Sequence, residues 1–489
     1  MAACEKTGIE GLDDVLCGGL PTGRMYVLEG DPGAGKTTVA MQFLLEGVRA
    51  GDRALYITLS ETSEEIAAIA ASHGWSLEGL DVLALSAADP AQDEANTLFH
   101  PSEVELGERI GEIVATIDRV APKRVVLDSC SELRLLAQSP LRFRRQILSL
   151  KRHLTERGCT VVLIDNPTSV EGDVLLQSLG HGVIRLEQLA PAFGAERRRL
   201  RVTKLRGVAF RGGLHDFTIQ RGGLVVYPRL VAAEHLEGGS RIEALSSGLP
   251  GLDRLLGGGL ERGTATLLMG PAGTGKSALA TQYAVAAAAR GERALIYLFE
   301  EEADILKRRS ASLGLSLDGP IARGDIVLHQ VDPAELAPGQ FAHAIRADVE
   351  SRNARIVVID SLNGYLHAMP DERFLTLHLH ELLTYLRHRG VLAILVEAQH
   401  GLIGGMQSPV DVSYLADTVV LLRYFEAVGE VRKAMSILKK RSGRHESTIR
   451  EFKLGPNGIQ VGEPLVEFHG VLTGVPQFSG GRGVLQGEP

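Results

Sequence analysis

The sequence predicts an α/β fold in two tandem copies, each a mostly parallel sheet flanked by helices with antiparallel strands at its edge. The stretch "GDPGAGKT" at 30–37 recurs as "GPAGTGKS" at 270–277, so the two begin 240 residues apart (270 − 30). The same offset separates "GIEGLDDVLCGGL", which begins at Gly8, from "GLPGLDRLLGGGL", which begins at Gly248. A period of this length is far beyond a solenoid unit and indicates two copies of a whole domain.

The order of the expected elements is the same in both copies. In the first copy, apolar strands are expected at "MYVLEG" (25–30), "RALYITL" (from Arg53), "RVVLD" (ending at Asp128) and "TVVLID" (160–165), with helices between them. The matching strands of the second copy are "ATLLMG", "RALIYLF", "RIVVID" and "LAILVE". Helices alternating with strands that are apolar throughout are typical of a parallel sheet covered on both faces.

The last third of each copy looks different. "RRLRVTKLRGVAF" and "KAMSILKKRSGRH" lie among β-rich segments with turn residues, and they predict antiparallel strands at the sheet edge. We therefore expect a first domain at 1–230, a polar linker at 231–246, a second domain at 247–465 and a C-terminal segment at 466–489.

The composition indicates a soluble globular protein. Of the 489 residues, 44% are hydrophobic and 23% are charged, and the net charge is −8. Nucleic-acid binding is therefore not expected, because dedicated binders usually carry a basic excess. The four cysteines form no C-x-x-C pair, which indicates free thiols in a reducing compartment. No signal peptide is visible, and the longest apolar run, 278–289, is too short and too polar to span a bilayer, so we expect a cytoplasmic protein without a membrane segment.

Both glycine-rich stretches fit the phosphate-binding pattern G-x-x-x-x-G-K-[ST], and each follows an apolar strand and precedes a helix. In such a loop the Lys reaches the β- and γ-phosphates of ATP and the hydroxyl residue ligates Mg²⁺. These roles fall to Lys36 and Thr37, and to Lys276 and Ser277. The other expected nucleotide contacts are Gly30, Asp31, Pro32, Gly33, Ala34, Gly35 and Thr38 in the first loop, and Gly270, Pro271, Ala272, Gly273, Thr274, Gly275 and Ala278 in the second. The alternative, a turn that binds nothing, does not explain the strand and helix on either side.

Asp128 and Asp360 each end an apolar strand and precede a Ser. A carboxylate at this place, the Walker-B position, holds the hydration shell of Mg²⁺ in phosphate-loop enzymes. The alternative is a cap for the following helix. Since the acid recurs in both copies, we expect both to serve as metal residues.

The strand after each loop is followed by acidic residues, Ser60-Glu61 in the first copy and Glu300-Glu301 in the second. A Glu at that strand end can orient and deprotonate the nucleophile beside the γ-phosphate. The alternative is that these acids only begin a helix, where the helix dipole favours them. We expect Glu61, Glu300 and Glu301 to be catalytic.

Two late strands carry the pattern K-x-R, as Lys204 and Arg206 and as Lys439 and Arg441. Residues i and i+2 of a strand share a face, so each pair can reach a phosphate across a subunit boundary. The alternative is a pair of solvated charges on an edge strand. Spacing alone favours this alternative.

Together, the doubled "GLD…GGL" and phosphate loop, the acids after the next strand and the late K-x-R strand resemble the KaiC family of circadian-clock ATPases and autokinases. The resemblance covers almost the whole chain and extends to "SYLADTVVLLRY" at 413–424 and "EFHGVLTGVPQF" at 467–478. It implies two RecA-like domains, homo-oligomeric rings of six chains with ATP–Mg between subunits, and KaiB-like or other signalling partners. It also implies that Lys204, Arg206, Lys439 and Arg441 reach the neighbour's nucleotide, which reverses the inference from spacing.

Two departures from the family pattern affect the expected chemistry. Ser60 stands where the family has the first acid of the first domain, and a hydroxyl is a poor base near neutral pH. We therefore expect hydrolysis in the first domain either to be slow or to rest on Glu61. The family's Ser-Thr phosphorylation pair aligns with Ser413-Tyr414, so we expect serine autophosphorylation at Ser413.

Two other functions remain open from the sequence. A DNA-translocating motor of the RecA or DnaB kind would need basic loops facing a ring channel, and no clear basic loop lies between Asp128 and the first K-x-R strand. A scaffold in which ATP only joins subunits is favoured for the first domain by Ser60. Glu300 and Glu301 argue against it for the second.

Overall fold

The computed structural model of the chain describes residues 3–85, 101–166, 175–190, 194–235, 243–367, 372–399, 412–472 and 477–478. The chain divides into two compact units, Met1–Arg229 and Leu230–Pro489. Part of the expected linker (236–242) and most of the expected C-terminal segment (473–476 and 479–489) lie outside the described residues. Each helix in the described ranges is too short or too polar to span a membrane.

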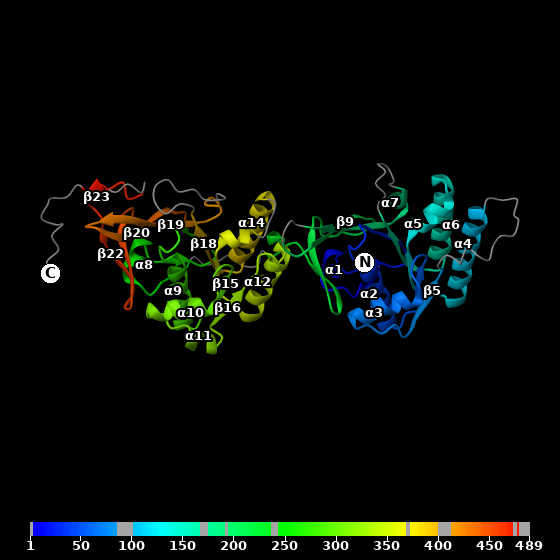
Figure 1. The fold of residues 1–489 in the computed structure, drawn as a ribbon, viewed down its shortest axis with the longest axis horizontal. Coiled ribbons are helices and arrows are strands. Elements are labelled where there is room, and N and C mark those ends of the chain that lie inside the picture. Colours follow the sequence, from blue (N-terminus) through cyan, green and yellow to red (C-terminus); the bar gives the residue numbers. More distant parts are fainter. Residues whose placement is uncertain are drawn as a thin grey trace. The chain divides into compact units, whose positions relative to one another are not determined.

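The first unit is built on one sheet, to which the described residues contribute nine strands (Figure 1). Six strands run parallel to one another, and three antiparallel strands extend one edge. In order across the sheet they are β11 (Gly223–Tyr227), β10 (His215–Gln220), β9 (Arg197–Leu205), β8 (Gly182–Leu189), β3 (Met25–Gly30), β7 (Thr160–Asp165), β6 (Arg124–Asp128), β4 (Ala54–Thr58) and β5 (Leu80–Ala84).

Helices cover both faces of this sheet. One face packs against α1 (Leu12–Val15), α2 (Lys36–Arg49) and α3 (Ser63–His73), and the other against α4 (Pro101–Val120), α5 (Cys130–Ala137), α6 (Pro140–Glu156) and α7 (Leu175–Leu179). Successive strand residues alternate between the two cores, so that Val27 lies in one and Leu28 in the other. Because both faces are buried, the central strands are apolar along most of their length, and their polar residues lie mainly at or near the strand ends.

The second unit repeats this plan (Figure 1). Across its sheet the strands are β16 (Ile326–Gln330), β15 (Ala294–Leu298), β17 (Ile356–Asp360), β18 (Leu392–Ala398), β14 (Ala265–Gly270), β19 (Thr418–Ala427), β20 (Glu430–Lys440), β21 (Arg450–Gly455) and β22 (Gly458–Pro464). One face packs against α8 (Pro250–Leu255), α9 (Lys276–Ala289), α10 (Ala303–Ser312) and α11 (Asp318–Ala322), and the other against α12 (Pro338–Arg352), α13 (Leu362–His367) and α14 (Glu372–His388).

Short elements complete the units. They are the antiparallel pairs β1 (Cys4–Glu5) with β2 (Leu20–Pro21), β12 (Ala244–Leu245) with β13 (Leu260–Glu261), and β23 (Phe468–His469) with β24 (Gln477–Phe478), and the 3₁₀ turn η1 (Ala232–His235). The last pair packs on the second sheet, where Phe468 meets the rings of Phe425 and Phe478 edge-on.

The predicted fold class, two mostly parallel sheets with antiparallel edge strands and flanking helices, is confirmed. The sequence analysis did not identify two of the six parallel strands in each unit. Of these, β8 and β19 pair with the central strands β3 and β14, in the region where only antiparallel strands were expected. The other two are β5 and β16. Both lie at the outer edge of their sheets, where most of their residues are only half-buried. An edge strand of this kind lacks the continuous apolar run by which the other parallel strands were found.

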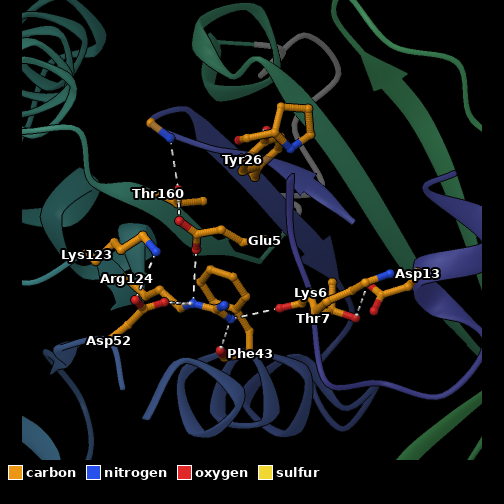
Figure 2. Close-up of polar contacts among 12 residues, drawn as sticks. Glu5, Lys6, Thr7, Asp13, Tyr26, Phe43, Asp52, Lys123, Arg124 and Thr160 are labelled. Atoms are coloured by element: carbon orange, nitrogen blue, oxygen red, sulfur yellow. Dashed lines mark hydrogen bonds and ion pairs between the residues drawn. The ribbon is translucent and has the colours of Figure 1, made fainter. Parts of the chain in front are cut away.

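A buried ion pair fastens the N-terminal strand of the first unit to the sheet (Figure 2). The Nε atom of Arg124 lies 3.0 Å from Oε2 of Glu5, and the side chains are 4% and 3% exposed. Arg124 also donates to the carbonyls of Lys6 and Phe43, at 2.8 and 2.9 Å. The other oxygen of Glu5 accepts a hydrogen bond from Thr160 at 3.0 Å. Asp52 lies 3.4 Å from the same Nε atom, so Arg124 compensates the charges of two acids at this place.

The second unit fills the same place with apolar side chains. Leu245 on β12, Ile356 at the start of β17 and Leu392 at the start of β18 correspond to Glu5, Arg124 and Thr160, and all three lie in one hydrophobic core. The fold therefore accepts either a satisfied ion pair or an apolar set at this position.

We expect Arg124→Ala to destabilise the first unit by about 3–5 kcal/mol, because it leaves Glu5 buried without its partner. The triple variant Glu5→Leu, Arg124→Ile and Thr160→Leu, which copies the second unit, should lie within about 1 kcal/mol of the unmodified chain. Denaturant unfolding followed by fluorescence isolates the first unit, since Trp75 is the only tryptophan of the chain. A triple variant as unstable as Arg124→Ala would show that the ion pair itself stabilises the unit. The cost of leaving one buried charge without its partner would then not explain the effect of Arg124→Ala.

Candidate functional site

Each glycine-rich loop leads from a central strand into a helix whose first residue is the lysine of the loop. Gly35 precedes α2 and Gly275 precedes α9, with left-handed φ angles of 96° and 105°. Residues with a side chain rarely adopt this conformation, so glycine is needed where the chain turns into the helix. The unpaired N–H groups of each helix N-terminus thus lie beside the loop, as an anion-binding site requires.

The lysine side chain of each loop is folded onto the loop's own backbone. The Nζ atom of Lys36 donates to the carbonyls of Gly30 and Asp31 at 2.7 and 2.8 Å. Lys276 makes the equivalent bonds to the first two residues of its loop, at 2.8 and 2.7 Å. Burial lowers the pKa of Lys36, and lowers that of Lys276 to about 8, while nearby carboxylates oppose the shift. Each cation is therefore held at the loop by neutral carbonyl groups, which an anionic ligand can replace.

In the first unit the Walker-B carboxylate meets the loop hydroxyl. The Oδ2 atom of Asp128 accepts hydrogen bonds from Thr37 at 3.0 Å and from the hydroxyl of Tyr56 at 2.7 Å. Burial raises the pKa of Asp128, and these two hydrogen bonds oppose that shift. The predicted residues Lys36, Thr37 and Asp128 are thus gathered at the carboxyl end of the sheet.

The second unit has the same arrangement. Asp360 ends β17, is half-buried, and lies beside Ser277. Burial raises the pKa of Asp360, and the hydrogen bond with Ser277 lowers it.

The donor atoms of these pairs suit Mg²⁺, which prefers hard oxygen ligands and keeps much of its water shell. Thr37 with Asp128 and Ser277 with Asp360 each supply a hydroxyl and a carboxylate within one site. No group of three or more His, Cys, Asp or Glu side chains able to enclose a metal occurs in the described ranges. A metal here would therefore depend on water and on phosphate oxygens as well as on the protein.

The first positions of the two acid pairs are exposed at the strand ends. Ser60 and Glu300 are both exposed, and both follow the last residues of β4 and β15. Burial lowers the pKa of Lys276 and raises that of Asp360, and the charge of Glu300 raises both. Glu300 therefore lies within electrostatic reach of the loop lysine and the Walker-B acid, whereas Ser60 adds no charge at the matching place.

The second positions, Glu61 and Glu301, are half-buried and differ in their partners. Burial raises the pKa of both carboxyl groups, and the charge of the nearby Walker-B acid raises it further. The Oε1 atom of Glu301 forms an ion pair with Nη1 of Arg309 at 2.8 Å, which lowers its pKa. Glu61 has no such cation, and the hydroxyl of Tyr56 lowers its pKa instead.

Sequence reasoning missed four residues of these sites. Tyr56 and Arg309 contact the acids as just described. Asp165 and Glu397 lie at the ends of β7 and β18. Burial lowers the pKa of the loop lysines, and the negative charges of Asp165 near Lys36 and of Glu397 near Lys276 oppose that shift. The acids that end "TVVLID" and "LAILVE" recur in both copies, so this signal was available. Tyr56 and Arg309 give no such signal, because the other copy has isoleucine at both places, Ile296 and Ile69.

Each K-x-R strand contains a β-bulge, and the lysine of each is tethered, that is hydrogen-bonded, to a backbone carbonyl of a preceding segment. In β9 the pairing skips one residue before Lys204, and in β20 it skips one before Lys439. The Nζ atom of Lys204 donates to the carbonyl of Gln177 at 2.6 Å. Lys439 donates to the carbonyls of Ser413 and Ala416 at 2.9 and 2.8 Å. Both lysines therefore hold the segment that leads into the preceding strand.

The expected phosphoacceptor segment is hydrogen-bonded to the second K-x-R pair. Arg441 donates to the carbonyl of Tyr414 at 2.8 Å and lies 3.6 Å from Asp417. Ser413 is half-buried, whereas Tyr414 is 52% exposed. The geometry thus joins Ser413, Lys439 and Arg441 into one local unit.

The interval between Asp128 and the first K-x-R strand is more basic than the sequence analysis stated. It contains no clear basic loop among the described residues, but α6 exposes Arg142, Arg144, Arg145 and Arg152 to solvent. The aromatic ring of α6, Phe143, is buried beneath the guanidinium of Arg134.

Comparison with known proteins agrees with this arrangement. A family model described as "ATPase: KaiC" matches residues 5–231 and 245–466. The circadian clock protein KaiC3 of Synechocystis sp. is 26% identical over 97% of this chain and 94% of its own length. The circadian clock oscillator proteins KaiC of Acaryochloris marina and Synechococcus elongatus are each 27% identical over 96% of this chain, and over 90% and 91% of their own lengths. Since the family match spans both units, the chain belongs to the KaiC family of ATPases.

Proposed function

We propose that the chain binds ATP with Mg²⁺ in both units and hydrolyses it, faster in the second unit than in the first. One observation carries the proposal. In each unit a loop lysine, a loop hydroxyl and a Walker-B carboxylate meet at the carboxyl end of a parallel sheet, but only the second adds an exposed acid, Glu300, beside them.

Each residue then has a defined task. Lys36 and Lys276 exchange the loop carbonyls for the β- and γ-phosphates of ATP. Thr37 with Asp128, and Ser277 with Asp360, hold Mg²⁺, which when bound neutralises charge on the β- and γ-phosphate oxygens. Glu300 orients the attacking nucleophile and accepts its proton.

The first unit lacks this exposed acid. Of the two positions matching Glu300 and Glu301, only Glu61 is acidic in this unit, and it is half-buried. We infer that the first unit retains ATP for longer than the second, and that retained ATP stabilises the assembly of chains.

We expect Glu300→Gln to reduce turnover by the second unit on the order of 100-fold, since it removes a general base. The Lys36→Ala background isolates the second unit for this measurement.

Conversely, Ser60→Glu in a Lys276→Ala background should raise turnover by the first unit about 10-fold, because it restores the missing carboxylate.

Steady-state phosphate release measures both rates. Ser60→Gln is the matched control, since it has a side chain of similar size without a base. If Ser60→Gln accelerates the first unit as much as Ser60→Glu, the missing carboxylate does not explain the difference between the units.

We further infer, from membership of the family, that the chains form rings of six with ATP at the subunit boundaries, and that Lys204, Arg206, Lys439 and Arg441 contact the neighbour's nucleotide. The tethers of Lys204 and Lys439 support this inference, because they hold each K-x-R strand to a defined segment of its own chain. A signalling partner of the KaiB kind would then bind the ring.

Native mass spectrometry is expected to show a species of six chains, each of 52.5 kDa, with ATP. Lys36→Ala should reduce this species more than Lys276→Ala, because the first unit holds its ATP longer. Arg206→Ala should reduce it as well, whereas Arg201→Ala, an exposed arginine on the same strand, should not. Equal losses from both arginine variants would contradict a specific contact.

We propose that the second unit also transfers phosphate to Ser413, and that this activity serves circadian-type or other signalling. Lys439 and Arg441 support the proposal, because the cations that would reach a neighbour's γ-phosphate also hold the backbone of the acceptor segment. The exposed ring of Tyr414 replaces the second acceptor of the family, so a single phosphorylated residue is expected.

Incubation with ATP followed by phosphopeptide mapping is expected to place phosphate on Ser413. Ser413→Ala and Lys276→Ala should abolish this label, and Ser442→Ala, a nearby serine, should retain it. Tyr414→Thr should add a second labelled residue, because it restores the family's acceptor. A chain that turns over ATP and leaves Ser413 unlabelled would remove the kinase from the proposal.

One observation favours the alternative of a DNA motor, namely the exposed arginines of α6. The buried Phe143 weighs against it, since single strands bind largely by stacking on exposed aromatic rings. Strong stimulation of ATP hydrolysis by single-stranded DNA would favour the motor over the signalling protein.

A further inference from the structure

Tyr56 is a feature of the first unit that the proposed mechanism does not use. It lies on β4, two residues before the strand ends, and its side chain is fully buried. Its hydroxyl donates to Oδ2 of Asp128 at 2.7 Å. A polar group placed so deep in a parallel strand costs free energy unless it is hydrogen-bonded, so its partner defines its role.

The same hydroxyl affects the charge state of Glu61. Burial and the charge of Asp128 raise the pKa of Glu61, and Tyr56 lowers it. The Oε2 atom of Glu61 is buried without a hydrogen bond. Tyr56 is thus beside both carboxylates, Asp128 and Glu61, which otherwise repel each other in a buried site.

In the second unit a different residue lies beside the two carboxylates. Ile296 occupies the position of Tyr56, and Glu301 is held by the guanidinium of Arg309 from α10. The first unit has Ile69 at the position of Arg309. Each unit therefore carries one polar residue that contacts an acid of its site, Tyr56 on Asp128 and Arg309 on Glu301, and neither unit carries the other's.

From this exchange we infer that Tyr56 is a positioning residue of the first ATP site. Its hydroxyl fixes Oδ2 of Asp128 together with Thr37, which leaves Oδ1 for the hydration shell of the metal. By holding Asp128 it also sets the surroundings of the acid that remains in this unit, Glu61, in the absence of an acid at Ser60. The inference rests on the proposed ATP hydrolysis by the first unit.

The experiment uses the full chain with Lys276→Ala, so that only the first site turns over ATP. Tyr56→Phe should lower kcat about 10-fold with little change in the KM for ATP, since the hydroxyl contacts acids and not the nucleotide. Tyr26→Phe is the matched control, because Tyr26 is also a fully buried tyrosine of the sheet, and its hydroxyl donates to the carbonyl of Pro21, away from the acids. The control should leave kcat unchanged.

A double-mutant cycle with Glu61→Gln separates positioning from a general structural role. If Tyr56 acts through Glu61, Tyr56→Phe should lower kcat less than about twofold in the Glu61→Gln chain. An equal loss of kcat in both backgrounds would overturn the part of the inference that concerns Glu61, and a Tyr56→Phe chain with unchanged kcat would overturn the inference as a whole. Trp75 fluorescence confirms that each variant chain is folded.

A second readout does not depend on turnover. The Mg²⁺ concentration that supports half-maximal binding of a non-hydrolysable ATP analogue should rise about 10-fold in Tyr56→Phe, as for other groups that orient a metal residue, and should not change in Tyr26→Phe. An unchanged Mg²⁺ requirement would overturn the inference. A Lys276→Ala chain without any ATP turnover would refute the proposed hydrolysis, and the Mg²⁺ requirement would still decide the role of Tyr56.

Discussion

The parallel register of the central strands is the constraint on which both sites depend. In the first unit β4 pairs with β6 so that Thr58 lies opposite Asp128, and in the second Leu298 lies opposite Asp360. The carboxyl ends of parallel strands meet at one edge of the sheet, and ligands of such folds bind there. A shift of one residue in this register would turn the Walker-B acid to the other face and separate it from the loop hydroxyl. The apolar residues of the strands, packed between two helical layers, are what maintain that register.

Within this shared frame the two units differ in a few side chains. Ser60 and Glu300 differ in charge at the strand end. Tyr56 donates a hydrogen bond to the Walker-B acid of the first unit, whereas Arg309 forms an ion pair with the second acid of the second unit. At the opposite edge of the sheet, the Glu5–Arg124 pair of the first unit is an apolar set in the second. Duplication thus preserved the backbone, while the chemistry and the buried polar groups diverged. The differences concentrate where a side chain meets a partner from another element, because backbone packing does not constrain the residue there.

Much of the fold was predictable, because its signals are local. The loops, the apolar strands and the acids that end them are each contained in fewer than ten residues, and the duplication presents each signal twice. Tyr56 and Arg309 were not predictable in this way, since their roles arise only when separate elements meet. The half-buried strands β5 and β16 lack an apolar run, and the tether of Lys439 to Ser413 depends on a bulge that spacing does not reveal.

The central claim is that the two sites divide the work, the first retaining ATP and the second turning it over. The most direct test is the nucleotide bound to each site after incubation with excess ATP, rapid gel filtration and chromatography of the released nucleotide. Lys276→Ala reports the first site and Lys36→Ala the second. The division of work predicts mostly ATP on the Lys276→Ala chain and mostly ADP on the Lys36→Ala chain. Equal fractions of ADP on the two chains, or the reverse order, would contradict it.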